Sequence, residues 1–310
     1  MATFLARALG LDPAPPPERC PILPPDDIWN TPVDRLPVHP RSDDYVAEIG
    51  DEAPVHPDFG SGEWPPGSGS PIGIPYVEAA ADAQPVPIHF TAYGDESDPG
   101  PYPVPADAPV EGGPDADGDR HVIVLDRHDC RLYELFAAYP RADGSWEAAS
   151  GATFDLTTSD LRPDGWTSAD AAGLPIFPGL VRYEEVASGH IGHALRFTAP
   201  RTRDDHVWPA RHHAGAGGDP SLPPMGQRFR LRGDFDTSGF DPAVEVILEA
   251  MKTYGIVLAD NGSSWFLSGA PDPRWDNDVL RQLRSVLGSD FEAVDVSGLM
   301  VDPGSGRAVP

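Results

Sequence analysis

The chain of 310 residues carries 49 acidic and 22 basic side chains, a formal net charge of -27, and 40% of its residues are apolar. Apolar content of this size supplies a hydrophobic core, which excludes a disordered chain. The negative charge repels nucleic-acid phosphates and anionic lipid headgroups, so we expect no nucleic-acid partner. The sequence contains no run of 18 apolar residues, so we also expect no membrane span.

The 38 prolines and 32 glycines interrupt the sequence too often for long helices. Such punctuation favours many short strands joined by turns and extended loops. We therefore predict a β-rich α+β fold with antiparallel, sandwich-like sheets and a few short helices late in the chain.

The chain begins with MATFLARALGL, which has apolar residues at helical spacing and is followed by a proline-rich stretch. The apolar stripe is formed by Phe4, Leu5, Ala8, Leu9 and Leu11. This segment resembles the final helix of an S-layer homology (SLH) repeat of actinobacterial surface proteins. The resemblance implies that residues 1–18 are the remnant of such a repeat with its linker, and that the protein is extracellular and attached to the cell surface. A helix this short is only marginally stable in water without a packing partner. The alternative is therefore a helix that docks on its own domain.

The body of the chain contains the segments GDRHVIVLD, GLPIFPGLVRYEEVASGHIGHALRF and VWPARHH in this order. In this respect it resembles uncharacterised secreted bacterial proteins of actinobacterial type. The resemblance implies one contiguous domain and brings no activity with it. We predict a single domain over residues 19–300, followed by a flexible tail over residues 301–310, and we expect a monomer.

Turn residues divide this domain into short elements. A helix is predicted over residues 41–50, with strands at 72–77 and 86–90. Three apolar segments separated by turns predict an antiparallel meander, and they cover residues 120–126, 130–140 and 145–156.

The second half of the chain contains the clearest helix signals. Further strands are expected at residues 193–199 and 228–232. Helices are predicted over 240–255 and 276–288, where an aspartate precedes each apolar pattern and a glycine ends it. Between them, the dipeptide Asn261-Gly262 predicts a hairpin within residues 256–269.

The sequence has two cysteines, Cys20 and Cys130. In an oxidising compartment they would form a disulfide that closes a loop of roughly 110 residues, worth on the order of 4–5 kcal/mol at most. Two buried thiols in a reducing compartment are the alternative. The surface location implied by the SLH resemblance favours the disulfide.

Two groups of residues have the types needed for a divalent metal. Histidines are densest between His190 and His213, where His206 and His212 are the candidate zinc ligands. Asp115, Asp117 and Asp119 alternate as calcium ligands would, although Arg120 occupies the position at which an EF-hand loop needs glycine. Surface histidines and a solvated acidic loop are the respective alternatives.

The common enzyme motifs are missing from the sequence, including GxSxG, HExxH, the P-loop, CxxC and GxGxxG. Glycan cleavage does not depend on any of these motifs. Hydrolysis needs a pair of carboxyl groups and a lyase needs a His or Tyr base, and aromatic side chains bind the sugar rings in both cases. The candidate acid/base residues are His121, Glu134 and His193. The candidate sugar-binding residues are Tyr133, Trp166 and Trp208, for which a place in the core is the alternative.

These observations lead to three functional hypotheses. The first is an extracellular, cell-surface carbohydrate-active domain, a glycan hydrolase or lyase whose partner is a cell-wall or extracellular polysaccharide. The second is a glycan-binding or adhesive module without turnover, which a bound Ca²⁺ would stabilise. The third is a structural protein of the S-layer. The sequence leaves open whether the protein is an enzyme and whether it binds Ca or Zn.

Overall fold

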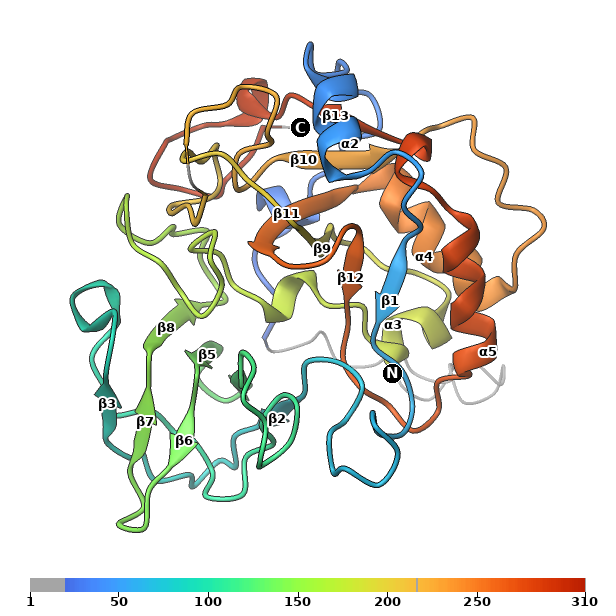
Figure 1. The fold of residues 1–310 in the computed structure, drawn as a ribbon. Helices are drawn as coiled ribbons and strands as arrows, with labels where there is room; N and C mark the ends of the chain where they lie inside the picture. The colour runs from blue at the N-terminus through green and yellow to red at the C-terminus, as the bar shows by residue number, and fades with distance from the viewer. Residues whose placement is uncertain (1–19, 216, 310) are drawn as a thin grey trace, which may run out of the picture.

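The computed structural model describes residues 20–215 and 217–309, so the predicted repeat remnant at residues 1–18 lies outside the described residues. The described chain is rich in strands, with 24% strand and 17% helix, which confirms the predicted β-rich α+β class. Its strands form three sheets, of which the largest lies beside the long helices and the two smaller ones lie together at the opposite side of the molecule (Figure 1).

The largest sheet has six strands. In order across the sheet they are β1 (His56–Asp58), β12 (Phe266–Ser268), β9 (Leu195–Ala199), β11 (Ile256–Asn261), β10 (Arg228–Leu231) and β13 (Phe291–Val294). The pairs β1–β12 and β9–β11 are parallel, and the remaining pairs are antiparallel. The sheet is therefore mixed, with parallel pairs beside the antiparallel pairs that the sequence predicted.

The predicted hairpin around Asn261-Gly262 is wrong, because β11 and β12 do not pair with each other. Strand β9 lies between them and hydrogen-bonds to both. The connecting segment bonds to this inserted strand, with Gly262 donating to Ala199 (3.0 Å) and the Thr198 hydroxyl donating to Ser263 (2.8 Å). The dipeptide marks a turn, but the partner of each strand is decided by a segment 60 residues earlier in the chain.

The two smaller sheets come from the middle of the chain. The four-stranded sheet has the order β2 (Tyr76–Glu78), β4 (Val122–Asp126), β5 (Arg131–Phe136) and β8 (Ser150–Asp155). The three-stranded sheet has the order β3 (Ile88–Phe90), β7 (Trp146–Ala148) and β6 (Tyr139–Pro140). The antiparallel run β4–β5–β8 confirms the predicted meander, although its third segment is divided between the two sheets.

The four-stranded sheet is buried on both faces. Along β4, Ile123 and Leu125 point into the main core, whereas Val122 and Val124 join a second core with Trp146 of the three-stranded sheet. Because side chains alternate across a strand, one short apolar run serves two cores. This sheet therefore joins the two halves of the molecule, and it carries polar residues into the interior between them.

Within residues 20–215 and 217–309, four α-helices flank the sheets, namely α2 (Ser42–Ile49), α3 (Tyr183–Ser188), α4 (Pro242–Thr253) and α5 (Asn277–Leu280). The predicted cap of α4 is confirmed, because the Asp241 carboxylate accepts from the Ala243 amide (2.9 Å). The last predicted helix is shorter, since α5 passes into a 3₁₀ helix over Arg281–Ser285. None of the helices in the described ranges has the length and apolar character needed to cross a bilayer.

The carboxyl-terminal residues, for which the sequence predicts a flexible tail, form backbone hydrogen bonds with the start of the described chain. The Ile28 amide donates to Gly306 (2.8 Å), and the Ala308 amide donates to Asp26 (2.8 Å). The side chain of Ala308 is buried. These bonds hold the end of the described chain against the start of the domain.

Candidate functional site

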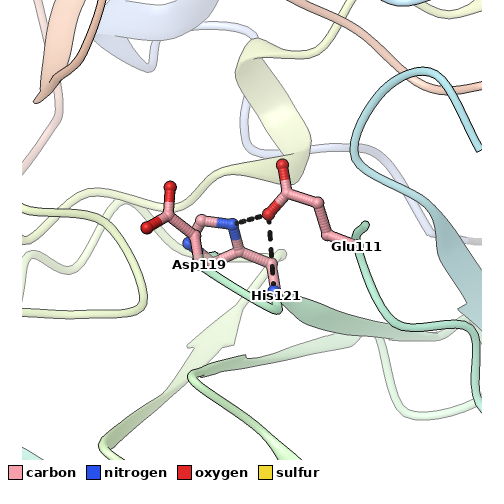
Figure 2. Close-up of side chains that lie close together, drawn as sticks. All are labelled: Glu111, Asp119 and His121. Atoms are coloured by element: carbon pink, nitrogen blue, oxygen red, sulfur yellow. Dashed lines mark hydrogen bonds and ion pairs between the residues drawn. The ribbon is translucent and has the colours of Figure 1, made fainter. Parts of the chain in front are cut away.

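His121 lies immediately before β4, at the junction of the two cores. Its Nδ1 is 2.5 Å from a carboxylate oxygen of Glu111, and its Nε2 is 2.9 Å from the carbonyl oxygen of Ala169. The backbone reinforces this contact, because the Glu111 amide donates to the His121 carbonyl (3.0 Å). Figure 2 shows Glu111 and Asp119 approaching the imidazole from different sides.

Both ring nitrogens of His121 face hydrogen-bond acceptors, which is the arrangement of an imidazolium. Burial lowers the pKa of His121, but the adjacent Glu111 carboxylate outweighs it and raises the pKa to about 9. For Glu111, burial raises the pKa and the His121 charge outweighs it, so the net pKa is lowered. His121 and Glu111 thus form a buried ion pair at neutral pH.

Glu111, Asp119 and His121 are the one group in the described residues that brings three potential metal-ligand atoms within 4.8 Å of one another. A metal would have to displace the hydrogen bond between His121 and Glu111, because the other ring nitrogen already faces Ala169. The observed contacts satisfy the ion pair, and we assign no ion to the group.

The structure does not gather Asp115 and Asp117 with Asp119 into such a group within the described residues. The side chain of Arg120 occupies the inside of this loop, where it donates to the carbonyl oxygens of Pro114 (2.9 Å) and Ala116 (2.9 Å). A guanidinium therefore takes the carbonyl oxygens that a calcium ion would use.

His206 and His212 likewise join no three-ligand group in the described ranges. They lie in a stack of rings with His213 between them, at 6.2 Å and 5.5 Å between centroids. His206 faces Asp164 (3.1 Å), and His212 faces the Ala171 carbonyl (2.9 Å). The sequence found the histidine-rich region, but the rings stack and do not converge on one point.

Glu134 is fully buried and acts as an acceptor for the backbone. Its carboxylate receives the amides of Ile176 and Phe177 at 2.9–3.0 Å, where a 3₁₀ helix over Phe177–Gly179 begins. Burial raises the pKa of Glu134 to about 7, and these two amides oppose the rise. The side chain has the raised pKa expected of a general acid, but it is 0% exposed.

His193 belongs to a separate buried group. Its Nε2 accepts from Arg182 (3.0 Å) and lies 3.2 Å from Glu185, while its Nδ1 lies 2.8 Å from the Ala194 carbonyl. The three predicted acid/base residues therefore have three different sets of partners. Each is saturated by contacts within the protein.

The predicted sugar-binding aromatics are packed into the protein. Tyr133 lies against Tyr102 with ring centroids 5.1 Å apart, and Arg162 lies 5.5 Å over the ring of Trp166. The indole of Trp208 packs on the main core and donates to Ser305 (2.8 Å). All three side chains are partly buried, and Tyr133 and Trp208 pack against the two cores.

Arg196 of β9 forms a second buried ion pair close to His121. It donates two hydrogen bonds to Asp170 (2.9 and 3.1 Å) and one to the Ser268 hydroxyl (2.6 Å), with Asp260 at 3.9 Å. Burial lowers the pKa of Arg196, but Asp170 outweighs it and keeps the pKa raised. Burial, with help from the Asp170 charge, raises the pKa of Asp260 to about 7.

A cavity of about 570 Å³ opens beside these buried pairs. Two acidic side chains line it, Asp58 at the end of β1 and Glu111. Trp64 lies on the same wall, and 71% of its surface is exposed. Asn277 fixes the loop that precedes Trp64, because its side chain accepts from the Ser61 amide and donates to the Ser61 carbonyl, both at 2.9 Å.

The two cavity acids have pKa values displaced in opposite directions. Asp58 lines the cavity and is exposed to solvent, and partial desolvation by the neighbouring protein atoms, together with the negative charge of Glu111, raises the pKa of its carboxyl. Glu111 is held ionised by His121, as described above. Two carboxyl groups in one cavity whose pKa values are shifted in opposite directions can divide the roles of proton donor and negative charge toward the same bound molecule.

Sequence reasoning missed Asp58, Glu111 and Trp64. Asp58 lies in a strand of only three residues, which is too short to show a periodic pattern, and Glu111 lies in an irregular segment. Of the three, only Trp64 could have been noticed in the sequence, because a tryptophan in a Gly/Pro/Ser-rich loop is expected to be exposed and so to mark a binding surface.

The predicted disulfide is not formed in the structure, where Cys20 and Cys130 are buried thiols. They are nevertheless neighbours. Burial raises the pKa of the Cys20 thiol to about 12, and a hydrogen bond with Cys130 adds to the rise.

Comparison with protein-family models, with curated proteins and with solved structures gave no match. Function is therefore argued from the cavity and its side chains.

Proposed function

We propose that the protein is a glycoside hydrolase whose catalytic site is the cavity between β1 and Glu111. The observation that carries this proposal is the pair Asp58 and Glu111 in one cavity, with the pKa raised for the first and lowered for the second. Hydrolysis of a glycosidic bond needs one carboxyl group that donates a proton and one carboxylate that acts on the other side of the sugar. Asp58 is the acid and Glu111 is the carboxylate.

The surroundings of the two acids support a sugar as the bound molecule. Trp64 presents an exposed ring on the cavity wall, and aromatic faces are the usual platforms for sugar rings. A second hollow of about 490 Å³ borders the same loop and shares Pro71 with the cavity. Two hollows on either side of one loop provide room for several sugar units, which favours a polymer over a single sugar.

The residues behind the cavity have a positioning role in this proposal. His121 holds the Glu111 carboxylate in a fixed orientation, and the Ala169 carbonyl holds the imidazolium. Arg196 lies near enough to lower the pKa of both cavity acids, and Asp170 fixes its orientation.

The test is turnover by Asp58→Asn on polysaccharides that the wild type cleaves. We expect the rate to fall roughly 10²- to 10⁴-fold, because general acid catalysis contributes about that much. An aryl glycoside with a good leaving group should lose far less, since a phenolate departs without a proton. A merely structural role would lower both rates equally.

Asp129→Asn is the matched control, because Asp129 is an exposed aspartate in the turn between β4 and β5. It should retain wild-type activity. Glu111→Gln should also lose turnover on both kinds of substrate, with thermal unfolding followed in parallel because its ion pair with His121 is lost. Unchanged polysaccharide cleavage by Asp58→Asn would overturn the proposal.

A glycan-binding module without turnover is the second candidate, and the exposure of Trp64 favours it. Binding of a polysaccharide with no reducing ends released, and with equal affinity in Asp58→Asn, would establish this function in place of hydrolysis.

We also propose that the protein acts at the cell surface on cell-wall or extracellular polysaccharide. The support is the resemblance of its first residues to an SLH repeat and the adjacency of Cys20 and Cys130, which an oxidising compartment would join. Peptide mapping of the protein from its native cells without reduction should recover a Cys20–Cys130 cross-link. Recovery of the two free thiols alone would contradict the surface location.

A further inference from the structure

The cavity has a basic side as well as an acidic one. Arg281 and Arg284, in the 3₁₀ helix that continues α5, line it together with Asp58 and Glu111. In a chain with 49 acidic and only 22 basic side chains, two arginines facing one cavity form a local exception.

The two arginines differ in their partners. Arg281 is paired with Asp278, three residues earlier, so its charge is already compensated. Arg284 donates instead to Nδ1 of His56 (2.9 Å), and in the described part of the chain no carboxylate lies within ion-pair distance of it. Its guanidinium is therefore oriented but not neutralised.

His56 is well suited to hold Arg284 in this way. Its ring stacks on Phe266 with centroids 4.1 Å apart, which fixes the imidazole. Burial lowers the pKa of His56, and the Arg284 charge lowers it further, so the ring is neutral and accepts a hydrogen bond.

The contact also fixes the position of Arg284 relative to the proposed acid. His56 and Asp58 are two residues apart on β1, and side chains two apart on a strand point to the same face. Strand β1 therefore presents the His56 ring, which holds Arg284, and the Asp58 carboxyl on the same face, and both residues line the cavity. The remaining N–H groups of the guanidinium are available to a bound molecule.

We propose that the substrate is an acidic glycan whose sugar units carry an anionic group, and that Arg284 binds that group next to the cleaved bond. The inference rests on the proposed function and names its substrate class. The planar guanidinium matches a carboxylate or a sulfate ester in a two-pronged contact. Because the net charge of -27 repels a polyanion, a local cation is required to hold it.

The experiment compares a uronic-acid polymer with the same polymer after reduction of its carboxyl groups, and with a sulfated glycan, in about 0.15 M salt. We expect wild type to cleave one of the two acidic polymers with a kcat/KM about 10- to 100-fold above that for the reduced polymer. The preferred acidic polymer distinguishes a carboxylate from a sulfate as the recognised group.

Arg284→Gln should lose this preference by lowering kcat/KM on the acidic polymer alone, whereas Arg281→Gln, whose charge is already paired, should keep it. Equal cleavage of reduced and acidic polymers by wild type would overturn the inference and leave the hydrolase proposal standing. If no polymer is cleaved, the hydrolase proposal fails, and calorimetric titration with the same polymers decides the inference. Arg284-dependent binding of an acidic polymer supports it, and absence of such binding overturns it.

Discussion

Two pairs of acidic side chains in this protein differ in their access to solvent. Asp58 and Glu111, the cavity acids, line a cavity of about 570 Å³. Glu134 and Asp170, the buried acids, have 0% and 1% exposure. Burial perturbs the titration of both pairs, but only the cavity acids can reach a bound molecule.

The comparison shows why a raised pKa does not by itself identify a catalytic residue. Desolvation raises the pKa of Glu134 to about 7, against the opposing effect of the two backbone amides that its carboxylate accepts at a helix start. The same desolvation at Asp58 acts on a group that faces open space. Function therefore requires a perturbed group together with a route for substrate.

The largest expected effect is on the buried acids. Replacing Arg196 by methionine should lower the free energy of unfolding by about 3–5 kcal/mol, because Asp170 is left buried without its partner. Urea unfolding measures this. The matched variant is Arg141→Met, which breaks the exposed pair with Glu147 and should cost about 0–1 kcal/mol. Equal stability of the two variants would show that Asp170 does not depend on Arg196.

The next effect is the pH dependence of stability. The folded pKa values of Glu134 (about 7, from 4.5) and His121 (about 9, from 6.5) both lie above the values of the unfolded chain. The folded state then binds more protons than the unfolded state, so these groups make stability fall as pH rises from about 4.5 to about 9. The melting temperature should be lower near pH 8 than near pH 5, by on the order of 5 °C.

Glu134→Gln separates the contributions to this pH dependence. It should reduce the slope of the acidic half of the profile, because glutamine does not titrate, while Asp260, whose pKa is also raised to about 7, keeps part of that slope and His121 keeps the alkaline half. Asp129→Asn, at an exposed position, should leave the whole profile unchanged. A melting temperature that increases over this range would contradict the assigned directions.

The smallest effect concerns the wall of the cavity. Trp64→Ala should weaken binding of the polysaccharide roughly 2- to 10-fold, because a stacked ring contributes about 0.5–1.5 kcal/mol. Its melting temperature should stay at the wild-type value, since 71% of the side chain is exposed. Trp64→Phe keeps an aromatic face and should retain most of the affinity. Equal affinity of the alanine and wild-type proteins in calorimetry would remove Trp64 from the binding site.

Elements with strong local signals were predictable. The helix Pro242–Thr253 was marked by Asp241, by proline in its first turn and by its apolar spacing, and the structure has all three features. The antiparallel run of β4, β5 and β8 was marked by apolar segments separated by turns. In these segments the capping groups and the apolar periodicity lie within the element itself.

The candidate site was predicted only in part. His121 and Glu134 were singled out from the sequence as acid/base candidates, but their partners, Glu111 and the amides of Ile176 and Phe177, come from segments without a periodic pattern. Asp58 is in a strand of three residues, too short for any periodicity. Spacing along the chain carries no information about which loops meet across the core.

The sequence by itself determined the strand-rich class and the positions of the capped helix and the meander, because these follow from local pattern and composition. The tertiary structure decided that β9 separates β11 from β12, that His121 meets Glu111, and that Asp58, Glu111 and Arg284 share a cavity. The physical reason is that these contacts join segments 10 to more than 200 residues apart, so their energy depends on packing that exists only once the two cores have formed.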